Sequence, residues 1–431
     1  MIKHEYDALI IGAGAAGMAA ALELDKKGYK TALIDREDHL GGILMQCIHT
    51  GFGIHEFQEE LTGPEFAERF ISQIAASKID VFLETTVISF FSQGSVPEGS
   101  VPEGSVPATL KELYCVSPKG VIQFLSKTII LAMGCRERNR GNVRIPGTRP
   151  AGVFTAGLAQ RLVNIDGFIP GKEIVIIGSG DIGLIMARRM SWVGCKVKAV
   201  VEIMPYPSGL TRNVVQCLQD FNIPLYLSSQ TTRIFGNDRV EGVEITPIVD
   251  GLLVYDRKFR IDCDTILLSV GLIPENELSR KAGIDININT GGPLVDASLM
   301  TNIDGIFACG NVLHVHDLVD GAAEEAKRAG KNAAAWLEGT KPQNQIKIKA
   351  GANVRYVNPG MLCPHWDNKI FFRSMIKKNN AILEIYLDNE IIKKEEIGNV
   401  QPSEMINLAI SSIEIKKKLV KPESIMEINI F

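Results

Sequence analysis

Three glycines near the N-terminus and the acidic residue after them are spaced as in a dinucleotide-binding site. The glycines read Gly12-x-Gly14-x-x-Gly17, and Asp35 follows 23 residues after Gly12. In such a motif the first glycine permits a tight turn, the second lets a pyrophosphate approach the backbone, and the third lets a helix pack closely on a strand. The carboxylate is placed to accept hydrogen bonds from an adenosine ribose. The chemistry predicted here is the binding of a dinucleotide.

The same pattern occurs a second time, 166 residues further along the chain. Gly178-x-Gly180-x-x-Gly183 leads to Glu202, which lies 24 residues after Gly178. One chain therefore carries two independent dinucleotide motifs, each with its own acid for a ribose.

Each motif is flanked by elements that could hold it in place. Residues 8–11 and 31–34 read as buried strands on either side of an alanine-rich helix over 18–27. Residues 173–177 and 196–201 read as strands around a second helix that ends near 193. The sequence thus predicts an α/β fold with two Rossmann-like domains.

Three further segments, in which an apolar strand ends at a glycine, complete a family resemblance. They are Thr128-Ile-Ile-Leu-Ala-Met-Gly134, Thr265 to Asn276 and Thr301 to Asn311. With these, the chain resembles the flavoproteins with two dinucleotide-binding domains, such as thioredoxin reductase, the disulfide reductases and the NADH oxidases, over about residues 5–338. The resemblance implies FAD in the first site and NAD(H) or NADP(H) in the second. It also implies that the helix over about 320–336 points its positive end at the flavin.

The resemblance carries cofactor roles onto particular positions of this chain. For FAD they are Gly12, Gly14, Gly17, Asp35, Arg36, Gly41, Gly42, Val87, Gly134, Gly310 and Asn311. For the nicotinamide nucleotide they are Gly178, Gly180, Gly183, Glu202 and Gly271. Most members have an aspartate where this chain has Asn311, which can still form hydrogen bonds but brings no charge.

The cysteines exclude the reaction of the disulfide reductases. After Gly41-Gly42 the chain has one cysteine, Cys47, and no C-x-x-C pair occurs anywhere among its 8 cysteines. Cys47 could serve as a monothiol redox centre, because a thiolate beside a flavin can be stabilised electrostatically. The alternative is a small buried residue that packs near the flavin.

A narrower resemblance concerns the segments 42–53, 60–65 and 134–157. They look like a group of FAD-dependent oxidoreductases of bacterial glycerol-type operons, related to the larger subunits of opine, cyanide-forming and sarcosine oxidases. In that group the polypeptide is an NAD(P)H-handling component beside a separate flavoprotein and a small cysteine-rich protein. The resemblance therefore implies a partner that receives electrons.

Four histidines fall in segments that the resemblance brings near the flavin: His49, His55, His314 and His316. Imidazole titrates near neutral pH, so they are the candidates for proton delivery, with His49 named as catalytic beside Cys47. Each could instead be a packed or exposed side chain. Neither Cys47-x-His49 nor His314-x-His316 supplies enough ligands for a metal, and no metal is expected.

Composition excludes several classes of protein. Lys+Arg 46 against Asp+Glu 50 gives a net charge of −4, which lacks the basic footprint of nucleic-acid or anionic-membrane binding. The scattered cysteines fit a reducing compartment and the cytoplasm. The apolar stretch 8–24 carries the glycine motif, and the residues before it are acidic where a signal peptide has basic ones. We therefore interpret it as part of the fold and expect no signal peptide or integral membrane segment.

The expected organisation has four segments. They are an FAD domain in two parts, 1–157 and 271–340, an inserted NAD(P) domain over 158–270, and a small β-rich domain over 345–431. The tandem repeat GSVPEGSVPEGSVP at 94–107 is expected to form an exposed loop. Thr62-Gly-Pro-Glu65 predicts a capped helix start, and residues 368–375 and 381–387 alternate like strands. For the C-terminal domain we consider partner docking, dimerisation and a passive lid.

Three functional hypotheses follow. The first is an oxidoreductase that moves a hydride between NAD(P)H and FAD and passes electrons to a partner protein or small acceptor. NADH is favoured by Glu202, and NADPH stays open because Arg188 and Arg189 lie nearby. The second is a stand-alone NADH oxidase or peroxidase that uses Cys47. The third is a non-catalytic subunit that binds flavin or an adenylate.

Overall fold

The computed structural model describes residues 2–91, 110–412, 421 and 423–431, so the repeat at 94–107 lies outside the described residues. Contacts divide the described chain into two compact units. Of the described residues, the first unit comprises those within 1–45, 50–135 and 274–431, and the second comprises 46–49 and 136–273. The chain leaves the first unit at β9 (Cys135–Glu137) and returns at β19 (Leu272–Pro274), and these two strands pair with each other.

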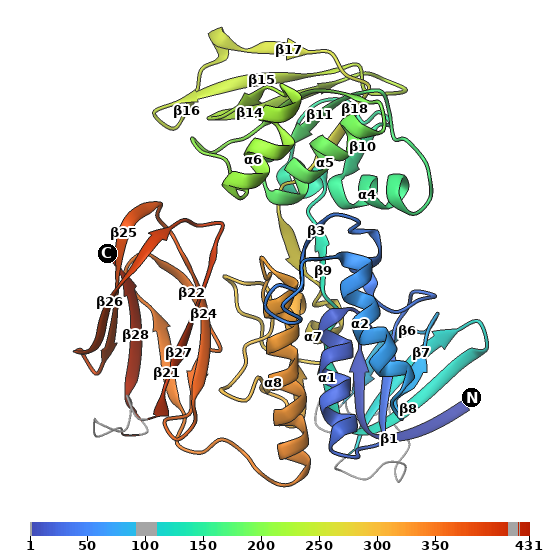
Figure 1. The fold of residues 1–431 in the computed structure, drawn as a ribbon, viewed down its shortest axis with the longest axis vertical. Coiled ribbons are helices and arrows are strands. Elements are labelled where there is room, and N and C mark those ends of the chain that lie inside the picture. The colour runs from blue at the N-terminus through green and yellow to red at the C-terminus, as the bar shows by residue number, and fades with distance from the viewer. Residues whose placement is uncertain (1, 92–109, 413–420, 422) are drawn as a thin grey trace. The chain divides into compact units, whose positions relative to one another are not determined.

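The first unit is organised around a mixed sheet of seven strands (Figure 1). Strands β5, β2, β1 and β8 pair in parallel, the carboxyl-terminal part of β8 pairs in parallel with β20, and β7 and β6 extend the sheet antiparallel. The strands are β1 (Ile2–Ile11), β2 (Thr31–Ile34), β5 (Asp80–Phe82), β6 (Thr86–Phe91), β7 (Lys111–Ser117), β8 (Gly120–Leu131) and β20 (Ile306–Ala308). The predicted strands at 8–11 and 31–34 are confirmed, and β1 extends the first of them toward the N-terminus.

Helices α1 (Ala15–Lys26), α2 (Gly63–Ala75) and α8 (Val319–Leu337) pack in this unit, together with the short helix α7 (Glu277–Lys281) and the two-stranded pair β3 (Thr50–Phe52) and β4 (Leu61–Thr62). The predicted start of α2 is confirmed, because Thr62 donates its N–H and its hydroxyl to Glu65 at 2.8 Å. Helix α8 lies directly on α1: a Cβ on Gly330 would come within 2.5 Å of the Ala20 carbonyl oxygen. A glycine is therefore required where the two helices touch.

The second unit holds a parallel five-stranded sheet and a smaller antiparallel sheet. The parallel sheet has the order β10 (Val153–Thr155), β18 (Thr265–Leu268), β11 (Glu173–Ile177), β12 (Lys196–Val201) and β13 (Leu225–Tyr226). Its helices are α4 (Ala156–Asn164), α5 (Asp181–Trp192) and α6 (Thr211–Cys217), with a single helical turn, α3 (Arg140–Val143), before them. The antiparallel sheet consists of β14 (Ser229–Phe235), β15 (Gly242–Val249), β16 (Leu252–Leu253) and β17 (Phe259–Ile261). The strands predicted at 173–177 and 196–201 match β11 and β12.

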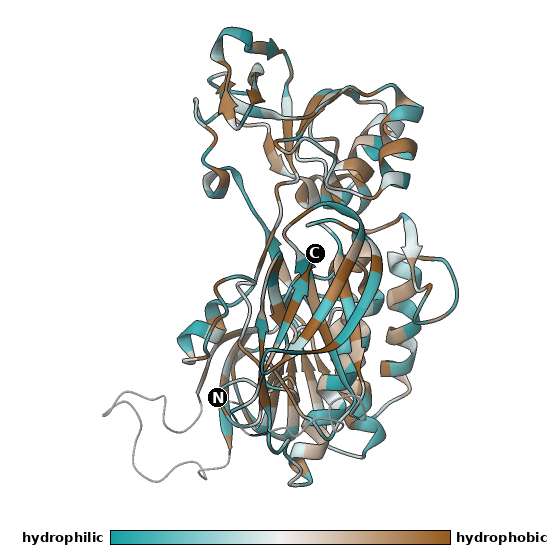
Figure 2. Cartoon of the chain, turned by 90° about the vertical axis from the view of Figure 1, so that its left-hand side faces the viewer, coloured by the Kyte–Doolittle hydropathy of each residue, from teal (hydrophilic) through white to brown (hydrophobic). Residues whose placement is uncertain are grey.

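The β-rich C-terminal region expected from about residue 345 is present. Two sheets enclose their own apolar core. One sheet consists of β23 (Met361–Leu362), β21 (Ile346–Ala350), β28 (Ile425–Ile430), β25 (Lys378–Leu387) and β26 (Glu390–Val400). The other consists of β22 (Val354–Asn358), β24 (Asn368–Ser374) and β27 (Met405–Ile410). Both alternating segments are strands, and they belong to different sheets. In Figure 2, apolar residues, coloured brown, occur along the strands, as expected where one face of a sheet is buried.

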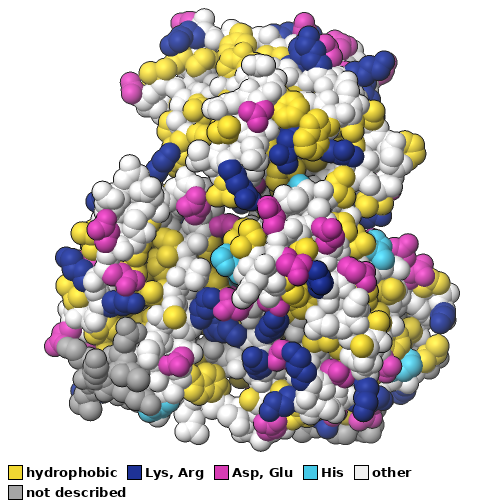
Figure 3. Space-filling model, viewed as in Figure 1, with side chains coloured by type: hydrophobic (Ala, Val, Ile, Leu, Met, Phe, Trp, Pro, Cys, Tyr) yellow, Lys and Arg dark blue, Asp and Glu magenta, His cyan; other side chains and the backbone are white. Residues whose placement is uncertain are grey.

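Basic and acidic side chains lie side by side over α8 in Figure 3. The ion pairs of this region include Lys327 with Glu56, Lys331 with Glu23, and Lys369 with Glu324. These lysines are matched by acids, so they do not form a one-signed field that would attract a polyanion.

Candidate functional sites

The first glycine turn has the shape that close approach of a ligand requires. Gly12 has φ +105° and donates its N–H to the Ile34 carbonyl, and a Cβ on it would lie 2.4 Å from the Ala132 oxygen. A Cβ on Gly17 would lie 1.7 Å from the Gly12 oxygen, so α1 can reach β1 only through a glycine. By contrast, a Cβ on Gly14 would meet nothing within 4 Å. Gly14 therefore borders open space at the N-terminus of α1.

That helix N-terminus suits an anion. Gly14 is the N-cap residue of α1, no side chain caps the helix, and its first turn contains no acidic residue. Unpaired N–H groups and the positive end of the helix dipole favour a negatively charged group at such a position. The turn thus fits a pyrophosphate.

Asp35 follows β2 beside this turn. Its carboxylate accepts the N–H of Ala13 at 2.5 Å and that of Glu37 at 2.9 Å. Its backbone oxygen accepts the N–H of Thr85, two residues before Val87 in β6. Asp35 and Val87 therefore come from segments that bond to each other, while the Arg36 side chain is exposed to 73%.

The other predicted positions of the first site also gather at α1. Gly41 donates its N–H to the Ala13 oxygen at 3.0 Å, and a Cβ on Gly42 would lie 3.3 Å from Gly14 Cα. Gly310, with φ +70°, approaches α1 so closely that its Cβ would lie 2.7 Å from the Ala16 Cβ. Residues from distant parts of the chain thus surround one helix N-terminus.

Asn311 and Gly134 lie next to this group. The Asn311 side-chain oxygen accepts the N–H of His316 at 2.9 Å, and its amide lies 3.5 Å from the Cys135 sulfur. Gly134 has φ +71° and accepts the N–H of Glu275 at 3.0 Å. In the described structure Asn311 orders its own turn, a role that its position in the motif did not indicate.

The second glycine turn repeats the geometry of the first. Gly178 has φ +95° and a Cβ on it would lie 2.0 Å from the Ser269 oxygen, while a Cβ on Gly183 would lie 2.6 Å from the Gly178 oxygen. A Cβ on Gly180 would meet only the Ser269 hydroxyl, at 3.8 Å. Gly271, with φ +96°, accepts the N–H of Arg138 at 2.9 Å. The turn leaves the same open approach to a helix N-terminus.

Glu202 follows β12 and is buried, with 4% exposure. Its carboxylate accepts the Ser179 N–H at 3.0 Å, the hydroxyls of Ser179 and Ser208 at 2.5 and 3.0 Å, and the Met204 N–H at 2.9 Å. These four donors hold the Glu202 carboxylate at the turn. The placement matches that of Asp35 at the first site.

Asp181 distinguishes the second turn from the first. It stands in the first turn of α5, and its carboxylate accepts the Leu210 N–H at 2.9 Å and the Asn213 amide at 2.6 Å. The carboxylate thereby ties the start of α6 to α5. It also adds a negative charge at a helix end where α1 has none. The sequence contained this signal, an acid directly after the second glycine.

Residues 46–49 cluster with the second unit. Gln46 donates to the Gly157 oxygen at 2.9 Å, and the Cys47 thiol lies 3.7 Å from the Gln160 side-chain oxygen in α4. Burial raises the pKa of Cys47 to about 12. Since the reactive form of cysteine is the thiolate, Cys47 is held in its unreactive form at neutral pH. His49, the other predicted catalytic residue, is half-buried, and its Nε2 atom is buried.

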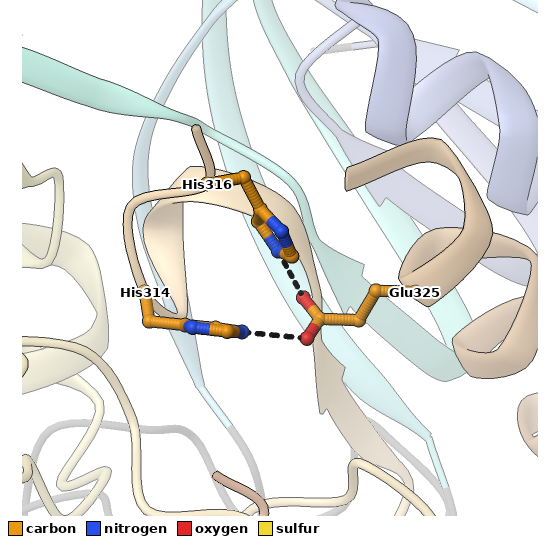
Figure 4. Close-up of side chains that lie close together, drawn as sticks. All are labelled: His314, His316 and Glu325. Atoms are coloured by element: carbon orange, nitrogen blue, oxygen red, sulfur yellow. Dashed lines mark hydrogen bonds and ion pairs between the residues drawn. The ribbon is translucent and has the colours of Figure 1, made fainter. Parts of the chain in front are cut away.

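The other three candidate histidines lie in two different environments. His55 is exposed, and its backbone N–H donates to Asp320 at 3.0 Å. His314 and His316 are brought together with Glu325 of α8 (Figure 4). One ligand atom from each of the three lies within 4.8 Å of the others. Sequence reasoning missed Glu325, because only the fold brings an acid of the helix onto the histidine turn.

The Glu325 cluster is fully enclosed. Its carboxylate is 0% exposed and the imidazoles are 1% and 3% exposed. Burial lowers the pKa of His314, against the opposing charge of Glu325. Burial alone would raise the pKa of Glu325, but the two imidazoles and their hydrogen bonds lower it below its ordinary value. At neutral pH the cluster therefore contains a carboxylate and a neutral His314.

Among the described residues, no helix is long and apolar enough to cross a membrane.

Comparisons with known proteins agree with this geometry. The family model described as pyridine nucleotide-disulphide oxidoreductase matches residues 6–333, which ends before β21. A subunit of the alkyl hydroperoxide reductase of Staphylococcus aureus (strain MSSA476) is 27% identical over 319 residues, which cover 72% of this chain and 54% of that protein. The chain thus spans about half the length of the first curated relatives it matches.

A second relative and a solved structure extend the comparison. The soluble pyridine nucleotide transhydrogenase of Pseudomonas entomophila (strain L48) is 24% identical over 357 residues, covering 76% of this chain and 71% of that protein. The crystal structure of T. acidophilum thioredoxin reductase superimposes with a TM-score of 0.61 at 22% identity, covering 77% of this chain and 98% of that one. This likeness concerns the fold.

Proposed function

Because the chain belongs to the pyridine nucleotide-disulphide oxidoreductase family, whose members use FAD and NAD(P)H, we propose that it transfers a hydride between a nicotinamide nucleotide and FAD. NADH is the preferred nucleotide, and the electrons pass on to a second acceptor. The observation that carries the proposal is the presence of two glycine turns of the same geometry, each open at the second glycine and each beside an acid. When bound, the flavin supplies the hydride and electron chemistry.

The residues of the first site fit FAD. Gly12, Gly14 and Gly17 open the backbone to a pyrophosphate at the start of α1. Asp35 would accept hydrogen bonds from the adenosine ribose. The rest of the predicted set would border the remainder of the cofactor: Arg36, Gly41, Gly42, Val87, Gly134, Gly310 and Asn311.

At the second site, Gly178, Gly180 and Gly183 would take the nicotinamide nucleotide, with Gly271 following β18. A 2′-phosphate would place a second anion beside the buried Glu202, where like charges repel. This is the reason for proposing NADH over NADPH.

Anaerobic titration of the FAD-loaded protein tests the function. We expect NADH to bleach the flavin absorbance stoichiometrically, and NADPH to require at least about ten times the concentration, a difference of about 1.4 kcal/mol. A flavin that stays oxidised with both nucleotides would contradict the proposal. That result would favour the non-catalytic, nucleotide-binding alternative, for which Asp181 at the second helix end is the supporting observation.

The oxidase or peroxidase alternative depends on Cys47. Because burial holds this thiol protonated, we expect Cys47→Ser to keep NADH-dependent bleaching of the flavin within about twofold of the parent rate. We also expect Cys47 in the native protein to resist iodoacetamide at about pH 8, since alkylation needs the thiolate. Mass spectrometry of the alkylated protein checks the second point. Loss of peroxide turnover in Cys47→Ser, with bleaching intact, would instead support a redox role for the thiol.

The acceptor and setting are part of the proposal. The narrower resemblance to oxidoreductases of glycerol-type operons supports a partner flavoprotein or a small cysteine-rich carrier as acceptor, and a homo-oligomer is a further proposal. The eight cysteines all occur as thiols, which supports a cytoplasmic location. We propose the divisions at about 157, 270 and 340 as the functional domain boundaries.

A further inference from the structure

The Glu325 carboxylate forms hydrogen bonds with three donors from one short segment. The group of Gly310, His314, His316 and Glu325 is called the hub. Its Oε2 lies 2.7 Å from His314 Nε2, and its Oε1 lies 3.2 Å from His316 Nε2. Its Oε1 also accepts the backbone N–H of Gly310 at 2.8 Å. All three donors belong to residues 310–316, shortly after β20, whereas Glu325 belongs to α8. Figure 4 shows the two imidazoles directed at the Glu325 carboxylate. One buried carboxylate thus fixes the segment to the helix.

Residues 310–316 also form hydrogen bonds with one another. Leu313 and His314 donate their N–H groups to the Gly310 oxygen at 2.9 and 3.2 Å, and His316 donates its N–H to the Asn311 side chain at 2.9 Å. Gly310 meets α1 at Ala16, next to the first glycine turn. Any shift of this segment would therefore move Gly310 and Asn311 against the helix N-terminus that is placed for the pyrophosphate.

The C-terminal sheets cover the hub. The Phe371 ring lies 5.3 Å from the His314 ring and 5.5 Å from the His316 ring, measured between centroids. Arg373 of the same strand, β24, donates to the Val315 oxygen at 3.0 Å and pairs with Asp317 at 2.5 Å. The aromatic cover excludes water, which makes each hydrogen bond to Glu325 stronger and its loss more costly.

The same three side chains could be interpreted as metal ligands, but their bonding favours a hydrogen-bonded hub. The carboxylate already receives three donors, and a metal would have to displace two of them. A metal on His314 Nε2 would also leave a proton on Nδ1, an atom that is buried without a partner among the described residues. Ligating imidazoles normally donate that second N–H to an acceptor. In the hub, Nε2 carries the proton and Nδ1 needs no acceptor.

We propose that Glu325 is a positioning residue for FAD: through Gly310, His314 and His316 it holds the Gly310–Asn311 turn in its binding conformation, under cover of Phe371. The inference rests on the proposed function of the first site. It also gives the C-terminal sheets a role, because they close the hub.

The test compares Glu325→Gln with Glu324→Gln in the full chain. Glu324 precedes Glu325 on α8 and pairs with Lys369 at the surface, so the control removes the same charge outside the hub. FAD is titrated into each apoprotein and the dissociation constant is taken from quenching of flavin fluorescence. We expect an increase of at least tenfold for Glu325→Gln and less than twofold for Glu324→Gln. Phe371→Leu, which keeps apolar volume but removes the ring, should give an intermediate increase.

Further measurements separate positioning from general stability. Residues 178–202 belong to the second unit, so NADH affinity should stay unchanged in Glu325→Gln. A lower Tm of the apoprotein with an unchanged FAD constant would mean that Glu325 is merely structural, and would overturn the inference. If Glu325→Gln does not fold, Phe371→Leu decides the question by the same constant.

Two other results would also overturn it. One is a stoichiometric metal in the purified protein that is lost in Glu325→Gln, with EDTA treatment of the parent weakening FAD binding equally. The other is failure of the parent protein to bind FAD, which would overturn the proposed function as well. By contrast, the unchanged FAD constant of Glu325→Gln described above would overturn the inference alone.

Discussion

Gly14→Ala is expected to fold normally and to bind FAD at least ten times more weakly, a loss of about 1.4 kcal/mol or more. Gly14 has φ −73° and ψ −171°, which any residue adopts, and its new Cβ would meet no protein atom within 4 Å. The methyl group would instead occupy the space through which a pyrophosphate approaches the backbone. Circular dichroism and Tm would report the fold of the apoprotein, and flavin fluorescence would report binding.

Gly17→Ala supplies the contrast to this variant. Its Cβ would lie 1.7 Å from the Gly12 oxygen, so α1 would have to move away from β1. We expect this variant to lose both stability and FAD. Wild-type FAD affinity in Gly14→Ala would show that the cofactor does not approach the first turn at its second glycine.

Gly180→Ala is expected to keep its FAD while NADH no longer bleaches the flavin at concentrations that suffice for the parent. Gly180 has φ −65° and ψ 164°, and its Cβ would make only an ordinary contact with the Ser269 hydroxyl at 3.8 Å. The substitution therefore fills the ligand space of the second turn without straining the backbone. The measurement is the same anaerobic titration, with dithionite used to show that the bound flavin can still be reduced.

The two N-cap variants, Gly14→Ala and Gly180→Ala, are expected to affect different nucleotides. Each should lose one nucleotide and keep the other, because each turn belongs to a separate compact unit with its own core. Equal bleaching by NADH in Gly180→Ala and the parent would argue that the second turn does not bind the nicotinamide nucleotide. This result would favour the alternative of a non-catalytic, nucleotide-binding subunit.

The parts of the fold that were predictable have local causes. The strands at 31–34, 173–177 and 196–201 are short apolar runs that end at an acid or lead into a glycine turn, and they occur in the structure with these bounds. The helix expected over about 320–336 occurs as α8, Val319–Leu337. Glycine spacing also indicated that Gly17 and Gly183 tolerate no side chain, because each packs against the first glycine of its own turn, Gly12 or Gly178.

The features that were not predictable depend on contacts between distant segments. The hub forms only because α8 returns the Glu325 side chain to the turn after β20. The environment of Cys47 is set by Gln160, which lies 113 residues away along the chain. Segments 368–375 and 381–387 both alternate like strands, but alternation does not indicate that they join different sheets.

The discontinuity of the first unit has a consequence for biosynthesis. Thr128 in β8 bonds the Gly305 oxygen 177 residues downstream, and Tyr29 bonds the Ala334 oxygen 305 residues downstream. During translation, β1 and α1 emerge from the ribosome first, whereas β20 and α8 emerge only after the whole second unit. Because a chain folds by units from its N-terminus as it is made, residues 136–273 can form their sheet while the earlier segment still awaits its last strand. The apolar face of α1 that Gly330 later covers is therefore exposed on the nascent chain until α8 has been made.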